Sequence, residues 1–328
     1  MYPESIAEKG VRVGKVSHKL CLFEGVSKGD LRLFNTGFKV NCVSSLYLDE
    51  QLWVLFNASC EGREQGIKTN KHIYNSYLGL LKYNLTTQDK HAPFVFIPLE
   101  TELKQLQLLN DKKLAFIDTT NNFNLGLLKE DKVNYGSYKP LLTINADGDH
   151  ISCFQLIKLK EDDCFKLFLG TTSGCVLIYL IEKTSFHIIK RLNHNSNFYV
   201  SSLSAYSFDK PPTLTSPFFI SLSTLDGFIK VFKDSSEQPL FEFVSLKKSF
   251  LSLQWDINPT MIFFLDQNDQ KVLNALSFNK NSTNSDYIKK MYRSPVKINN
   301  YALDTGRDHF ACVCDDGTIR VGKVKVSL

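Results

Sequence analysis

The chain lacks any apolar run long enough to span a membrane, and "MYPESIAEKG" at its start lacks the apolar core of a signal peptide. None of its eight cysteines forms a Cys-x-x-Cys pair, so the spacing typical of zinc ligands is absent. We therefore expect an intracellular protein with no membrane partner and no metal, whose cysteines are small buried hydrophobes in a reducing compartment.

Catalytic motifs are missing as well. The sequence contains no His-Glu-x-x-His, no phosphate-binding Gly-x-x-x-x-Gly-Lys-[Ser/Thr], no Gly-x-Ser-x-Gly and no dinucleotide-binding Gly-x-Gly-x-x-Gly. Asp147, Asp149 and His150 are grouped and could bind a cation, but Asp-Gly-Asp more simply forms a turn before the next strand. We expect no enzyme, no cofactor and no small-molecule substrate.

What the sequence does contain is β-structure. Phe, Trp and Tyr make up 12% of the residues, and helical periodicity is scarce. Short alternating apolar stretches flank tight turns at Ser173-Gly174, Asp226-Gly227 and Asp316-Gly317. Glycine accepts the positive φ that such turns need, so these segments predict antiparallel hairpins.

The hairpins recur along the chain, and Leu-Gly-Leu-Leu-Lys occurs at both 78–82 and 125–129. The first apolar residue after each turn recurs every 43 to 53 residues, at Leu31, Leu78, Leu125, Val176, Ile229, Val272 and Ile319. Seven units of this length predict a β-propeller with four strands in each blade.

This interpretation makes residues 1–328 a single propeller domain. The predicted blades cover approximately 10–35, 36–87, 88–131, 132–183, 184–234, 235–279 and 280–328. The first is too short for four strands, so we expect strands from both termini to close the ring, with Lys323–Leu328 near Val11–Val16.

The units ending in "DDGTIRV" and "LDGFIKVF" resemble WD repeats, although Phe34, Phe232 and Gly322 stand where Trp is expected and no Gly-His is in its usual place. The resemblance implies an all-β, seven-bladed WD40-like propeller with degenerate repeats. It also implies a non-catalytic scaffold that binds other protein subunits of a stable complex.

The apolar pattern of the later blades, in "PFFISLSTLDGFIKVF" and "SFLSLQWDI", resembles WD-repeat subunits of the general factor that recruits RNA polymerase III. The net charge of +5 also suits an assembly that works on DNA or RNA. We expect a nuclear rather than a cytoplasmic complex, and nuclear-pore, chromatin-modifying and ribosome-assembly propellers remain open as alternatives.

Two segments offer candidate partner-binding residues. In 279–298, five cations face one acid, and the candidates for nucleic-acid contact are Tyr287, Lys289, Lys290, Tyr292 and Arg293. A solvated, flexible loop between blades is the alternative, which we favour. In the insertion 60–76, the candidates are Arg63, Lys68, Lys71, His72 and Tyr74, and a tolerated surface insertion is equally open.

The proline-rich stretch Ser207–Phe219 is more simply a rigid loop than a docking segment. The sequence thus predicts a non-enzymatic protein-interaction scaffold. Direct binding of nucleic acid or a phosphopeptide through basic loops, and a propeller enzyme, remain the alternatives.

Overall fold

Strands and turns make up all of the chain that the computed structural model describes. The described residues are 14–15, 32–48, 51–59, 67–69, 72–74, 76–83, 94–99, 101–109, 112–130, 136–146, 149–183, 185–193, 198–244, 249–255, 261–277, 288–304 and 309–323. Within these ranges, there is no helix that could cross a membrane.

The chain divides into two compact units. Unit 1 is Met1–Thr119, Leu125–Pro140 and Lys290–Leu328, and unit 2 is Thr120–Asn124 and Leu141–Lys289. The prediction of a single domain over 1–328 stays a prediction.

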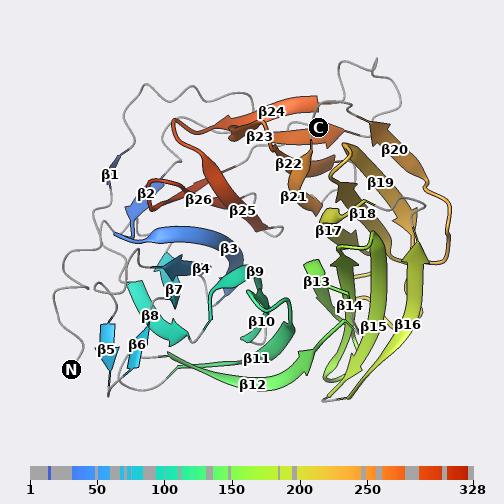
Figure 1. Ribbon diagram of the computed structural model, residues 1–328, viewed down its shortest axis with the longest axis horizontal. Coiled ribbons are helices and arrows are strands. Elements are labelled where there is room, and N and C mark those ends of the chain that lie inside the picture. Colours follow the sequence, from blue (N-terminus) through green and yellow to red (C-terminus); the bar gives the residue numbers. More distant parts are fainter. Residues whose placement is uncertain are drawn as a thin grey trace. The chain divides into compact units, whose positions relative to one another are not determined.

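Unit 1 contains two complete sheets and most of a third (Figure 1). In hydrogen-bonding order, the first is β1 (Gly14–Lys15), β2 (Arg32–Asn35), β27 (Thr318–Lys323), β26 (His309–Cys314) and β25 (Ile298–Asp304). The second is β3 (Lys39–Leu48), β4 (Gln51–Ser59), β7 (Ser76–Tyr83) and β8 (Phe94–Leu99), and the third is β12 (Gly136–Ile144), β11 (Phe123–Glu130), β10 (Lys113–Asp118) and β9 (Leu103–Leu108).

Unit 2 contains two more complete sheets and most of another. They are β13 (Ile151–Lys158), β14 (Cys164–Thr171), β15 (Cys175–Glu182) and β16 (Ser185–Asn193); then β17 (Val200–Tyr206), β18 (Phe219–Thr224), β19 (Phe228–Lys233) and β20 (Phe241–Val244); and then β21 (Phe250–Trp255), β22 (Met261–Asp266), β23 (Asp269–Ser277) and β24 (Ile288–Arg293).

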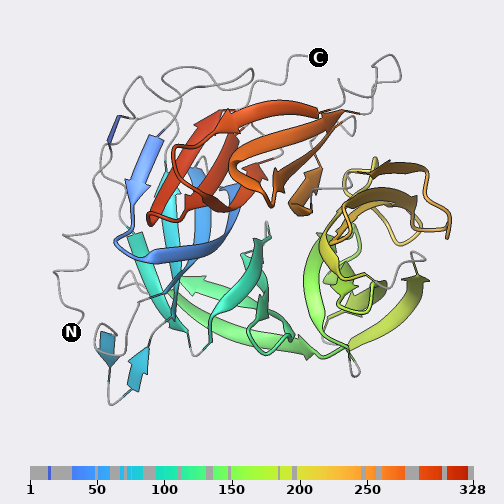
Figure 2. The same cartoon turned by 45° about the horizontal axis from the view of Figure 1, so that its top comes forward.

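The predicted count of seven blades is wrong, because the described chain forms six blade-type sheets. The strands after the first and the last predicted turns, β2 and β27, lie in the same sheet and were counted as two units. Leu33 of β2 pairs with Arg320 of β27, which joins the two ends of the described chain in one sheet, as expected (Figure 2). The partner of β27 is β2 rather than the segment around Gly14, which lies on the far side of β2.

The predicted hairpin turns are confirmed by their backbone. Gly174, Gly227 and Gly317 have φ of 85°, 91° and 74°, the left-handed region that a side chain resists. A Cβ on Gly317 would also lie 2.4 Å from the Phe38 carbonyl oxygen. Turn chemistry in the sequence therefore fixed where these strands reverse.

Side chains on β25, β13 and β17 form hydrogen bonds to the backbone of β3, β17 and β21, and so link neighbouring sheets. These strands carry a β-bulge near their start, for example between Ile151 and Cys153 in β13. The bulged residues donate to backbone carbonyls: Asn299 to Val40 (2.8 Å), Ser152 to Val200 (2.7 Å) and Ser201 to Phe250 (2.9 Å). These bonds connect neighbouring sheets of the same unit.

Apolar side chains fill the space between neighbouring sheets within each unit. In unit 1, one cluster packs around Phe56 and Val313 and another around Trp53 and Leu106. In unit 2, the corresponding clusters form around Phe168 and around Phe264. Strands buried on both faces explain continuous apolar runs such as β22, whose six residues are all buried.

Candidate functional site

Strand β16 exposes apolar side chains at the edge of its sheet. It is the last strand in the order β13-β14-β15-β16 (Figure 1). Seven of its nine residues are exposed, one is half-buried and one is buried. Phe186, Ile188 and Ile189 are 43%, 49% and 49% exposed. This is unusual, since side chains of this size are mostly buried in folded proteins.

The register with β15 explains how these side chains are presented. Phe186 pairs with Ile181, and Ile188 pairs with Tyr179. Both exposed side chains therefore lie on the same face of the sheet as these two buried side chains. The rings of Phe186 and Tyr179 are 6.1 Å apart. Ile189 is the extra residue of a bulge. The strand therefore presents an apolar surface supported by a rigid core.

The strands at the corresponding edge of the other sheets are β8, β12, β20, β24 and β2. Each has a feature that discourages pairing with a further strand. Pro98 lies in β8 and Pro140 in β12, and neither residue can donate a backbone hydrogen bond. β20 has only four residues, β24 is rich in Lys and Arg, and β2 is covered by β1. Of the last strands that the structure describes, β16 alone combines nine residues, no proline and three exposed large apolar side chains.

The charge on β16 has one sign. Its sequence SFHIIKRLN contains the cations Lys190 and Arg191 and no acid. The Lys190 ammonium donates to the Asp234 carbonyl (2.8 Å), which holds it against the next sheet. Arg191 is exposed and donates to Cys175 Sγ (3.5 Å). The strand therefore favours an acidic partner.

Unit 2 also carries other exposed large apolar side chains. They are Phe198, Phe208, Leu214, Leu225, Leu240 and Val244. All of these, like the three on β16, belong to unit 2, and none of the described residues of unit 1 is in this class. Among the described residues, the exposed large apolar side chains therefore belong to unit 2.

Comparison with solved structures identifies the architecture. The chain is similar to the β-propeller domain of Cps50 (Swd1) from Myceliophteria thermophila, with a TM-score of 0.53 and 12% identity over 97% of this chain and 99% of that one. It is also similar to the WD40 β-propeller domain of Doa1, with a TM-score of 0.52 and 12% identity over 93% and 97%. The fold is that of a WD40 β-propeller. No family model and no curated protein matches the sequence.

The WD-repeat resemblance is thus confirmed for the fold of this six-bladed WD40 propeller. Hydrogen bonds to aspartate side chains stabilise two of its hairpin turns. Asp316 Oδ1 accepts the N–H (3.2 Å) and the hydroxyl (2.6 Å) of Thr318. Asp226 likewise accepts the Thr224 hydroxyl. These aspartates stabilise the hairpins without the Trp and His of regular repeats.

The basic segment 279–298 is only partly described, and its described part starts as a strand rather than the favoured loop. Ile288–Arg293 forms β24, in which Lys290 is exposed and Arg293 is half-buried. Tyr292 is 0% exposed and its ring packs 5.1 Å from that of Phe310, so it offers no face for stacking on a base. Tyr287 and the Lys289 side chain lie outside the described residues, and nucleic-acid contact here stays a prediction.

The insertion in 60–76 forms a hairpin of its own. β5 (Ile67–Thr69) and β6 (His72–Tyr74) pair as a two-stranded sheet, with Thr69 opposite His72. Only the backbone is described at Lys68, His72 and Tyr74, and Arg63 and Lys71 lie outside the described residues. Partner binding by these side chains stays a prediction.

Asp149 is hydrogen-bonded to its neighbour His150 and to the turn between β14 and β15. Its carboxylate accepts hydrogen bonds from the His150 N–H (2.8 Å), the Thr172 hydroxyl (3.0 Å) and Ser173. Burial alone would raise the pKa of Asp149, but bonds from Ser173, Thr171 and Thr172 bring it below its usual value. Asp147 is outside the described residues, within which no three His, Cys, Asp or Glu gather as a metal site.

The proline-rich segment Ser207–Phe219 connects β17 to β18, of which Phe219 is the first residue, as the favoured loop interpretation predicts. It contains a cis peptide bond between Lys210 and Pro211. The exposed Phe208 ring packs edge-on against the rings of Tyr206 and Phe219, each 5.3 Å away.

The sequence analysis missed β16 as a candidate site. Its residues were placed at the start of the predicted blade 184–234, and no binding role was assigned to them. A useful indication was available, because β15 must be followed by a last strand at a sheet edge, and no proline interrupts Ser185–Asn193.

Proposed function

We propose that this WD40 propeller is a non-enzymatic protein-interaction platform within a larger complex, and that β16 binds an extended segment of a partner subunit. The observation that carries the proposal is the exposure of Phe186, Ile188 and Ile189 on one long edge strand. The non-catalytic part rests on the fold, since WD40 propellers generally serve as scaffolds.

The physical basis is strand addition. The edge of β16 turned away from β15 has N–H and C=O groups that a partner strand can pair with. Covering a half-exposed Phe or Ile contributes about 1 kcal/mol. Because β16 carries two cationic side chains, Lys190 and Arg191, and no acid, we expect the partner strand to alternate apolar and acidic residues.

A nuclear, transcription-associated assembly, such as the factor that recruits RNA polymerase III, is the finer form of this proposal. It is supported by the net charge of +5 and by the basic segment 279–298. Direct binding of nucleic acid is less favoured, because Tyr292, one of the two tyrosines proposed for stacking, is part of the core.

Affinity purification of the tagged protein from its own cells tests both levels. Ile188→Lys places a charge in the proposed interface, and we expect it to lower recovery of the co-purifying subunits at least about tenfold, the equivalent of 1.4 kcal/mol. The matched control is Leu225→Lys, because Leu225 is 47% exposed in the turn between β18 and β19.

Equal recovery with wild type and Ile188→Lys, at equal thermal stability, contradicts the assignment of β16. Subunits of a nuclear assembly that works on DNA or RNA are the expected partners. Partners confined to the cytoplasm contradict the finer proposal.

A further inference from the structure

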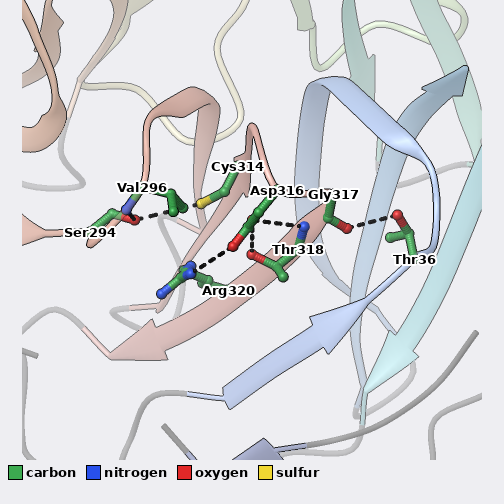
Figure 3. Close-up of polar contacts among 8 residues, drawn as sticks. All are labelled: Thr36, Ser294, Val296, Cys314, Asp316, Gly317, Thr318 and Arg320. Atoms are coloured by element: carbon green, nitrogen blue, oxygen red, sulfur yellow. Dashed lines mark hydrogen bonds and ion pairs between the residues drawn. The ribbon is translucent and has the colours of Figure 1, made fainter. Parts of the chain in front are cut away.

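A cluster of ionisable side chains lies inside the sheet that joins the two ends of the described chain (Figure 3). Cys312 in β26 is directly opposite Arg320 in β27 and Tyr301 in β25, so these three side chains form a row on one face. Cys314 lies two residues further along β26, and its side chain therefore points to the same face. The thiols of Cys312 and Cys314 and the guanidinium of Arg320 thus lie on the same buried face of the sheet.

The guanidinium of Arg320 is buried and incompletely paired. The residue is 3% exposed, and its Nη2 donates to Asp316 Oδ2 at 3.3 Å. The Nε–H finds no acceptor among the described residues. A buried donor without a partner costs about 1 to 3 kcal/mol, and more when it is charged. The Nε–H of Arg320 is therefore a position at which a hydrogen-bond acceptor would be stabilising.

Cys314 is the thiol that this environment ionises. Its Sγ is 3.8 Å from Ser294 Oγ, and the side chain is fully buried. A hydrogen bond from Cys312, followed by the Arg320 charge, lowers the pKa of Cys314 below its usual value. Burial raises the pKa of Cys312, so Cys312 stays the protonated donor. Asp316 is the acid that opposes ionisation of Cys314.

We propose that Cys314, on the same face of the sheet as buried Arg320, is a modification site that hydrogen peroxide oxidises to the sulfenate. The sulfur attacks one peroxide oxygen, an S–O bond forms and the O–O bond breaks. The leaving hydroxide takes the proton of the sulfenic acid, which leaves water and Cys–SO⁻. Sulfur loses two electrons and peroxide gains them.

The sulfenate oxygen is the acceptor that the cluster lacks. Arg320 Nε and the Tyr292 hydroxyl are both buried, and neither forms a hydrogen bond of good geometry within the described structure. Burial, followed by Cys312, raises the pKa of Tyr292, and the Arg320 charge lowers it. An anionic oxygen on Cys314 would give both groups an acceptor.

The burial of Cys314 limits which oxidants can reach its sulfur. Cys314 is the last residue of β26, and the next residues, Asp315 and Asp316, form the exposed turn to β27. A molecule of nearly the size of water needs only a local opening of this turn, whereas a bulky reagent needs the sheet to open.

Other buried cysteines serve as internal controls. Cys153 is 4% exposed, and burial raises its pKa to about 12. Cys42 is 0% exposed, and burial raises its pKa too. The experiment treats the native full chain with hydrogen peroxide, quenches it, alkylates the unfolded protein and measures each cysteine by peptide mass spectrometry.

We expect Cys314 to oxidise at least about tenfold faster than Cys153 and Cys42. The rate should rise with pH and reach half its maximum below the ordinary thiol pKa of about 8.5. A bulky maleimide should leave Cys314 unmodified in the folded protein. A Cys314 rate equal to that of Cys153, or one that rises only above pH 9, overturns the proposal.

Arg320→Met tests the role of the guanidinium, with near-ultraviolet circular dichroism as the check on folding. In a folded variant, we expect the Cys314 rate at pH 7 to fall about tenfold, while the Cys153 rate stays unchanged. An unchanged Cys314 rate overturns the proposal. If the variant does not fold, the pH profile of the wild-type protein decides.

Discussion

Replacing Gly79 by valine is expected to lower the free energy of unfolding by about 3 kcal/mol, because there is no room for a side chain at this position. Gly79 is opposite Phe56 on one side and Phe96 on the other. The rings of these two residues are 6.0 Å apart, and a Cβ on Gly79 would lie 2.2 Å from the Phe56 ring. Urea unfolding monitored by fluorescence measures the loss.

A double-mutant cycle separates this clash from other effects of the substitution. Phe56→Leu removes the ring, so Gly79→Val should cost much less in that background. Equal costs in both backgrounds, or a Gly79→Val variant as stable as wild type, contradict the packing described for this sheet.

Removing the carboxylate of Asp316 is expected to cost about 2 kcal/mol. Asp316 caps the turn through Thr318 and provides the carboxylate at 3.3 Å from buried Arg320. Breaking a fully buried pair costs about 3 to 5 kcal/mol, and the partial exposure of Asp316 reduces this. Denaturant unfolding of Asp316→Ala measures the effect.

Asp226→Ala is the matched control, because Asp226 bonds the Thr224 hydroxyl in the corresponding turn of unit 2. We expect it to cost about 1 kcal/mol, the usual value of one hydrogen bond. Adding Arg320→Met to Asp316→Ala should recover part of the loss, since the buried charge of Arg320 is then no longer present without its partner. A smaller loss for Asp316→Ala than for Asp226→Ala contradicts the account of this cluster.

Local chemistry made much of the fold predictable from the sequence. Ser173-Gly174, Asp226-Gly227 and Asp316-Gly317 form hairpin turns as expected, because turn conformation depends on adjacent residues. The two Leu-Gly-Leu-Leu-Lys segments do mark equivalent strands, β7 and β11. Their shared glycine has a reason that the sequence did not show, since aromatic rings of neighbouring strands cover Gly79 and Gly126.

The number of blades was not predictable from the period alone. Counting one strand per unit treats β2 and β27 as separate blades, whereas Leu33 pairs with Arg320 across almost the whole chain. Pairing between strands so far apart is decided by which edge is left unpaired. That choice leaves no periodic mark in the sequence.

The candidate site was harder to predict than the fold. An apolar strand such as SFHIIKRLN has the same composition whether its side chains are covered or exposed, and only the sheet order makes β16 an edge. Tyr292 is the opposite case, a residue expected at the surface that is buried. Basic neighbours suggested a surface position, but the strand turns this ring toward Phe310 in the core.

Amide hydrogen exchange of β16, measured in the isolated protein and in its purified native complex, tests the central claim most directly. Strand addition predicts that amides within Ser185–Asn193 exchange at least about tenfold more slowly in the complex, while those of the four-residue edge strand β20 do not change. Unchanged exchange along β16 in a complex that protects other strands would contradict the claim that this propeller binds its partner there.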